Sequence, residues 1–123
     1  MENKEKNLIV ELTFKFALSV VEYSESLEER KKYVVAKQLL RSGTSIGANV
    51  KEAQNAASVK DFLNKVRIAQ KEAEETEYWL EICKHSKNYP DCDNLLEQLK
   101  SILKIINKIV LTTHKKLAAQ GSN

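Results

Sequence analysis

The chain contains few of the residues that build sheets, long loops or disulfide frameworks. Its 123 residues include three glycines, one proline and two cysteines. Glycine and proline this sparse argue against a many-stranded sheet and against a linker between domains, and two cysteines are too few for a disulfide framework. No apolar run approaches the ~20 residues that a membrane-spanning helix needs, and the charged start MENKEK lacks the apolar segment of a signal peptide. We therefore expect an all-α protein of the cytoplasm, with no membrane contact and with reduced thiols.

Apolar residues are abundant and recur at helical spacing. They make up 42% of the chain and follow steps of three and four, which place them on one face of a helix. The pattern predicts a single domain, residues 1–123, with helices over approximately 5–27, 33–57, 59–87 and 93–118. Ser58 followed by Asp61 resembles a helix-capping pair at the start of the third helix. Short connections between long helices favour an antiparallel up-down-up-down four-helix bundle.

The first and fourth predicted helices carry more apolar surface than the inside of one bundle requires. In the first helix a stripe from Ile9 to Leu27 faces the core, and a second stripe is turned from it by about 100°. The fourth helix has a second stripe that recurs every seven residues. Because surplus apolar surface on a soluble protein marks association, we predict an oligomer interface formed by Val10, Phe14, Val21, Leu96, Leu103 and Val110. The alternative is a bundle in which the two terminal helices lie deeper.

The segment Gly43-Thr44-Ser45-Ile46-Gly47 matches the G-x-S-x-G pattern of a hydrolase nucleophile. That nucleophile needs a strand before the serine and a sheet that holds its acid and base, whereas this serine lies within a helical pattern. The two glycines instead indicate close helix approach or a local bend, since each costs about 1 kcal/mol relative to alanine inside a helix. We predict no catalytic residue and no enzymatic activity.

A polar stripe accompanies the core stripe of the second helix and is formed by Arg41, Ser45, Asn49 and Glu52. If the second and third helices fold back on each other near residue 57, the arginine comes level with acids of the third helix. The stripe then extends across the two helices to Glu72 and Glu75. Arginine suits carboxylate and phosphate equally well. Two interpretations stay open, an ion pair between the helices and a contact to nucleic acid.

Charge is distributed unevenly along the chain, although the net charge is only +3. Residues 1–29 carry three lysines against seven glutamates, and residues 30–57 carry six basic residues against one glutamate. Basic side chains on the polar faces of the second and fourth helices could neutralise nucleic-acid phosphates, above all if an oligomer multiplies them. The candidate nucleic-acid-binding residues are Lys37, Arg41, Lys51, Lys100, Lys104 and Lys108.

The sequence gives no pattern for a metal or a cofactor. Cys83, His85 and Cys92 combine two kinds of zinc ligand, but their spacing matches no zinc motif and no fourth ligand accompanies them. Neither histidine follows a glutamate at the spacing used by di-iron bundles. No phosphate-binding glycine loop occurs either. We predict no metal site and no cofactor.

Residues 38–80 carry a set of short motifs: Arg41-Ser42, Thr44-Ser45-Ile46, Asn49-Val50, Glu52-Ala53, Asp61-Phe62, Lys71-Glu72-Ala73, Glu75-Thr76 and Tyr78-Trp79-Leu80. This set resembles the signature of a bacterial family of four-helix bundles, the 23S rRNA-intervening sequence proteins. The resemblance implies an up-down bundle that assembles as a homopentamer. The chain is also distantly similar to the accessory variability determinant proteins of diversity-generating retroelements, which are basic pentameric bundles that work with a reverse transcriptase and its RNA.

These observations lead to two hypotheses about function. The first is a non-enzymatic homo-oligomer that binds RNA or DNA through phosphate contacts on basic surface helices. The second is a scaffold whose charge asymmetry serves subunit contacts and an unidentified protein partner, with no role in nucleic-acid binding.

Overall fold

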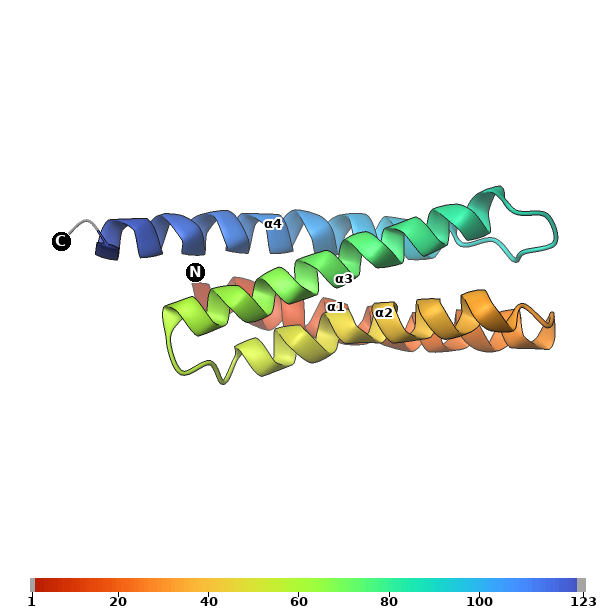
Figure 1. The fold of residues 1–123 in the computed structure, drawn as a ribbon, viewed down its shortest axis with the longest axis horizontal. Helices are drawn as coiled ribbons and strands as arrows, with labels where there is room; N and C mark the ends of the chain where they lie inside the picture. Colours follow the sequence, from red (N-terminus) through yellow and green to blue (C-terminus); the bar gives the residue numbers. More distant parts are fainter. Residues whose placement is uncertain (1, 122–123) are drawn as a thin grey trace.

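Four long helices run back and forth along one axis (Figure 1). The computed structural model describes the backbone of residues 2–121 and the side chains of residues 7–121. The helices are α1 (Glu2–Glu29), α2 (Tyr33–Ala53), α3 (Val59–His85) and α4 (Asp93–Gly121). No strand occurs within residues 2–121, and no helix there is long and apolar enough to cross a membrane. The predicted all-α, up-down-up-down four-helix bundle is confirmed.

Each helix packs against two neighbours. Helix α1 contacts α2 and α4, and α3 likewise contacts α2 and α4. Helices α2 and α4 therefore lie at opposite corners of the bundle. The side formed by α1 and α2 is therefore opposite the side formed by α3 and α4; in Figure 1 α4 lies at the top, α1 and α2 at the bottom, and α3 crosses between them.

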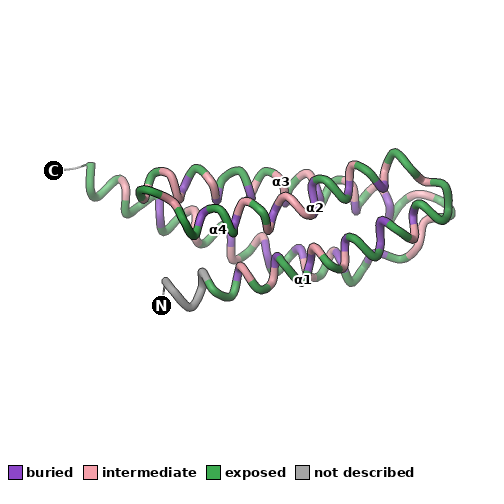
Figure 2. Tube along the Cα trace, turned by 90° about the horizontal axis from the view of Figure 1, so that it is seen from below, coloured by how far each residue is buried: buried purple, intermediate pink, exposed green. Residues whose placement is uncertain are grey.

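The apolar core runs along the inner side of all four helices, where the buried residues lie in Figure 2. The predicted core stripe of α1 is buried except for Leu12, which is half-buried. In α3 the structure buries Leu63 and leaves the neighbouring Phe62 half-buried. Full burial of one large aliphatic or aromatic side chain stabilises the fold by about 1.5–3 kcal/mol. Burial of these side chains is therefore the main stabilising contribution to the fold.

Helix α2 ends at Ala53, four residues before the predicted boundary at residue 57, and Ala57 is exposed outside it. The physical reason is the start of α3. Ser58 adopts an extended conformation, and its hydroxyl accepts the backbone N–H of Asp61 at 3.0 Å. The Asp61 carboxylate in turn accepts the N–H of Ala57 at 3.1 Å. These bonds satisfy donors at the helix N-terminus and fix the connection outside the core.

Two glycines of α2 allow close approach of α1. A Cβ atom added to Gly43 would lie 2.8 Å from Val20 Cγ1, and one added to Gly47 would lie 3.2 Å from the backbone oxygen of Thr13. Ser45, between them, lies in the same uninterrupted helix and donates its hydroxyl to the carbonyl of Arg41 at 2.6 Å. The glycines therefore belong to helix packing, and the serine lacks the preceding strand that a hydrolase nucleophile requires.

Candidate functional surfaces

Arg41 of α2 reaches two carboxylates of α3. Its Nη1 lies 3.3 Å from Glu72 Oε1, and its Nη2 donates to Glu75 Oε2. The same Glu75 oxygen accepts the indole N–H of Trp79 at 3.3 Å. The hydrogen bond from Arg41 holds the pKa of Glu75 below its usual range. With the arginine side chain 48% exposed, this is an ion pair at the rim of the α2–α3 contact, as the first interpretation of the stripe proposes.

The other members of the predicted polar stripe do not join that cluster. Ser45 bonds within α2, and the Asn49 side chain likewise donates to the Ser45 carbonyl at 2.8 Å. Glu52 lies 3.7 Å from Lys65 of α3. The stripe thus divides into local bonds within α2 and two separate ion pairs to α3.

A buried polar contact that the sequence analysis does not include lies behind the ion pair. The hydroxyl of Thr76 lies 2.9 Å from the hydroxyl of Ser42 and 2.7 Å from the carbonyl of Glu72. Both side chains are fully buried. Thr76 follows Ala73 by three residues and precedes Leu80 by four, so helical spacing alone could have placed it on the buried face of α3.

Exposed apolar side chains gather along the side formed by α1 and α2. Phe14 is 63% exposed, Leu18 53%, Leu40 40% and Val21 37%. A groove of about 270 Å³ separates Phe14 and Val10 from Gly47 and Ala48. We name this surface the α1/α2 apolar face and define it by Val10, Phe14, Ala17, Leu18, Val21 and Leu40. The sequence analysis includes Val10, Phe14 and Val21 as interface residues but not Leu18 or Leu40.

The predicted interface residues of α4 have a different position. Leu96, Leu103 and Val110 are half-buried and pack against the core. Their stripe flanks Asn107, whose side chain accepts a hydrogen bond from Gln70 of α3 at 2.7 Å. These three residues thus lie beside α3, away from the α1/α2 apolar face. In α4 the structure matches the alternative of a deeper terminal helix, whereas in α1 it matches the prediction of surplus surface.

The outer side of α4 is basic. Lys100, Lys104 and Lys108 are exposed there. From residue 98 to residue 121 the chain contains five lysines and no aspartate or glutamate. Lys37 and Lys51 are exposed on α2, at the corner opposite α4, so one chain does not combine them with the lysines of α4 into one surface.

Helix α3 adds a basic stripe that the sequence analysis does not include. Lys60, Arg67 and Lys71 are exposed at steps of seven and four, which place them on one face. Arg67 Nη2 lies 3.4 Å from His114 Nδ1, so this part of α3 runs beside the second half of α4. We name the combined surface the α3/α4 basic surface and define it by Lys60, Arg67, Lys71, Lys104, Lys108 and Lys115. The spacing of these three residues could have identified the α3 stripe from the sequence. A count of charges does not show it, because basic and acidic residues balance over residues 58–87.

The other end of the same side is acidic. Its exposed acids are Glu74, Glu77, Glu81, Asp93 and Glu97. Because Gln70 meets Asn107 and Lys84 lies 3.6 Å from Asp93, antiparallel pairing brings Lys100 level with Glu77. Nearby opposite charge compensates Lys100 and reduces its attraction for phosphate. Lys100 therefore stands at the border of the basic surface.

Two buried thiols lie near the hydroxyl of Tyr23. Cys83 and Cys92 are 1% and 2% exposed. The Tyr23 hydroxyl donates to the carbonyl of Pro90 at 2.7 Å, and the Cys92 thiol donates to the carbonyl of Leu80 at 3.3 Å. Burial raises the pKa of Cys83, and raises that of Cys92 to about 11. His85, by contrast, lies at the surface 3.7 Å from Glu81, so the structure does not gather the three residues of the weak metal pattern.

The fold and its surfaces define a small helical-bundle protein with a closed core, one apolar side and one partly basic side. Within that class the chain belongs to the 23S rRNA-intervening sequence protein family, whose model matches residues 5–108. A crystal structure from Bacteroides thetaiotaomicron VPI-5482, of a protein with unknown function from the S23 ribosomal protein family, is 39% identical in sequence. It aligns with a TM-score of 0.81 over 86% of this chain and 97% of that one. The comparison with curated proteins gives no match.

Proposed function

We propose that this chain is a non-enzymatic homo-oligomer that binds RNA or DNA through the α3/α4 basic surface. The observation that carries the proposal is the segregation of charge on that side of the bundle. Basic residues of both helices occupy one end, where Arg67 and His114 bring the two stripes together. Contacts of lysine and arginine with phosphates give affinity with little dependence on sequence.

The α1/α2 apolar face supports the oligomeric part of the proposal. It is large and exposed in a single chain, with Phe14 63% exposed, and contiguous apolar surface of this kind is usually covered by a partner. Because it lies opposite the α3/α4 side, association through it leaves the basic surface accessible. The family resemblance implies five chains, and five basic surfaces multiply the number of phosphate contacts.

The second candidate function is a protein-interaction scaffold, and the same apolar face favours it. If the face binds an unidentified protein instead of further copies of the chain, the charges of α3 and α4 serve solubility. The two functions differ in one measurable property, which is salt-dependent binding to nucleic acid.

The test is fluorescence anisotropy with labelled RNA and DNA oligonucleotides of mixed sequence at 50 and 200 mM salt. Wild-type protein should bind with micromolar or weaker affinity at the higher salt, and affinity should rise steeply at the lower salt. The double variant Lys104→Gln/Lys108→Gln should bind more weakly and show a flatter salt dependence. The matched control Lys37→Gln/Lys51→Gln removes the same charge from α2 and should bind like wild type. If wild-type protein binds neither nucleic acid at 50 mM salt, the scaffold function is the better conclusion.

A further inference from the structure

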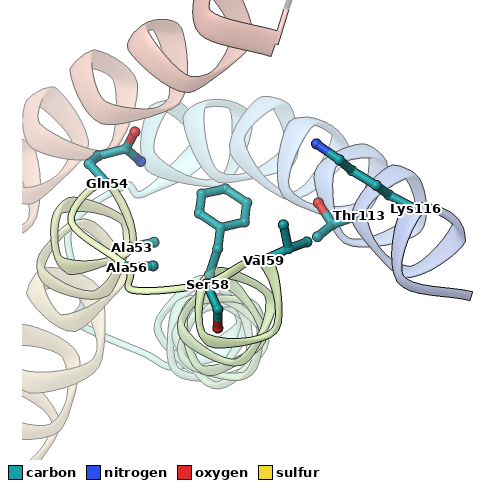
Figure 3. Close-up of a pocket in the computed structure, with 8 residues that line it drawn as sticks. Ala53, Gln54, Ala56, Ser58, Val59, Thr113 and Lys116 are labelled. Carbon is teal, nitrogen blue, oxygen red and sulfur yellow. The ribbon is translucent and has the colours of Figure 1, made fainter. Parts of the chain in front are cut away.

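A hollow of about 220 Å³ opens at the end of the bundle where α2 connects to α3. Figure 3 shows Gln54, Ala53 and Ala56 on one side of it and Thr113 and Lys116 of α4 on the other. Phe62 and Val59 of α3 also line it. The lining therefore combines one aromatic ring and a few aliphatic side chains with a larger share of polar surface.

Thr113 is the unusual member of this lining. As a residue it is only 9% exposed, no described residue hydrogen-bonds its hydroxyl, and the hydroxyl oxygen itself stays accessible. The other buried threonines differ in this respect, because Thr13 donates to the carbonyl of Ile9 and Thr76 to that of Glu72, each at 2.7 Å. Figure 3 shows the Thr113 hydroxyl directed toward the hollow, between Val59 and Lys116. The accessible hydroxyl therefore offers a hydrogen-bond donor and acceptor to a ligand in the hollow.

The hollow also lies at the basic end of the α3/α4 side. Lys116 lines it, and Lys60 stands one residue after Val59. The N-terminus of α3 carries the positive end of the helix dipole to the same place. Asp61 is the nearest acid in the sequence and accepts the N–H of Ala57 at 3.1 Å; its single negative charge is outnumbered by the two lysines and the helix dipole. An anionic group at the rim is therefore favoured.

We propose that this hollow binds one unpaired nucleotide, with its base against Phe62, a base-edge polar atom on the Thr113 hydroxyl and its phosphate near Lys116 and Lys60. The inference rests on the proposed function and deepens it, because it makes the ligand of the basic surface single-stranded. A base in a duplex is stacked on both faces and cannot enter a hollow of this size. Stacking on an aromatic side chain and contacts to base edges are the means by which proteins bind unpaired bases.

The test compares a labelled single-stranded 12-mer with the duplex of the same sequence at 50 mM salt, by fluorescence anisotropy. Wild-type protein should bind the single strand several-fold more tightly. Thr113→Val keeps the side-chain shape and removes the hydroxyl, and should weaken single-strand binding about five-fold, the effect of one lost hydrogen bond. It should leave duplex binding unchanged. Thr112→Val, on the exposed neighbouring position of α4, is the matched control and should bind both ligands like wild type. Thermal unfolding monitored by circular dichroism checks that all variants fold.

Ala56→Leu provides a second variant that fills the hollow without entering the core, since Ala56 lies outside the helices. It should also weaken binding of the single strand selectively. A free nucleoside monophosphate added at millimolar concentration distinguishes the sources of the ligand. If the free nucleotide displaces the labelled single strand, the hollow also accepts soluble nucleotides. If the single strand stays bound and is still preferred over the duplex, the hollow accepts only a nucleotide that is part of a strand.

Two results would overturn the inference. If single strand and duplex bind equally and Thr113→Val binds like wild type, while Lys104→Gln/Lys108→Gln loses affinity, the hollow is not a nucleotide site and the proposed function stands. If wild-type protein binds neither ligand at 50 mM salt, both the proposed function and the nucleotide site fail.

Discussion

Gly43 lies directly against Val20, so closely that an added Cβ atom would be 2.8 Å from one γ-methyl group and 2.9 Å from the other. The contact fixes the spacing of α1 and α2 along the middle of the bundle. Val20 is completely buried, so its side chain has no free space into which it can rotate. The closeness of the two helices therefore depends on the absence of a side chain at residue 43.

We expect Gly43→Ala to destabilise the protein. Alanine is favoured over glycine inside a helix by about 1 kcal/mol, but forcing a methyl group into a closed core costs about 1–3 kcal/mol. The free energy of unfolding in urea should therefore fall. Gly121→Ala is the control, because an added Cβ there meets nothing within 4 Å. Equal stability of wild type and Gly43→Ala would mean that α1 and α2 can separate freely.

The pKa of Glu75 predicts a dependence of stability on pH. Arg41 lowers this pKa in the folded state, so the carboxylate stabilises the fold at pH values above its unfolded pKa of about 4.3. That contribution is lost as the pH falls through the folded pKa. Because Arg41 is 48% exposed, solvent limits the pair to at most about 1 kcal/mol.

The measurement is the urea midpoint of wild type and of Glu75→Gln between pH 7 and pH 3. Glu75→Gln should be less stable at pH 7, and the difference should shrink toward pH 3. Arg41→Ala should show the same trend. A difference that is independent of pH would assign the loss to packing instead of charge.

Phe14→Glu should dissociate the oligomer while preserving helix content. Phe14 is 63% exposed in the single chain, so a charge there costs little within the bundle but is buried when copies associate. Light scattering should give about five times the 14.0 kDa chain mass for wild type and one chain mass for the variant. Leu111→Glu changes a comparably exposed residue of α4, 55% exposed, and should retain the oligomer. A monomeric wild type at micromolar concentration would contradict the assembly, and an unfolded Phe14→Glu would contradict the assignment of the face.

The buried thiols predict a loss of stability at high pH. Burial raises the pKa of Cys92 to about 11, whereas an unfolded thiol titrates near 8.5. The neutral thiol therefore contributes stability in full below the unfolded pKa, and this contribution disappears as the pH rises through about 11. Between pH 8 and pH 10.5 the urea midpoint should fall more for wild type than for Cys92→Ala.

At pH 8, thiol-labelling reagents should react with the folded protein only at the rate of its unfolding. Rapid labelling would place a thiol at the surface.

The repeat of apolar residues was sufficient to predict the four helices, because a core stripe such as that of α1 follows directly from the helical period. The pairing of Arg41 with Glu75 was also predictable, since the short α2–α3 connection fixes which residues come level. Periodicity alone could not tell whether the second apolar stripe of a helix packs against another helix of the same chain or against a second chain. Leu103 and Phe14 therefore look alike in sequence and differ in the structure, where α3 covers the first and the second stays exposed.

The basic surface was predictable only in part. Lys104 and Lys108 are recognisable because α4 lacks acids nearby. Lys60 and Arg67 belong to a helix with balanced charge, and only the three-dimensional arrangement separates its basic half from its acidic half. The hydroxyl of Thr113 gave no signal at all, since a threonine on a core stripe usually bonds to the preceding helical turn.

The even number of antiparallel helices brings both ends of the chain to the same end of the bundle as the α2–α3 connection (Figure 1). A purification tag or fluorescent protein fused at either terminus is therefore on the same end of the bundle as the hollow lined by Thr113 and Lys116, where it can interfere with the proposed ligand. The far end, with the turns at Lys31 and Asn88, offers attachment points about a full helix length away. Labels for the binding measurements proposed above belong there, where they lie away from the hollow.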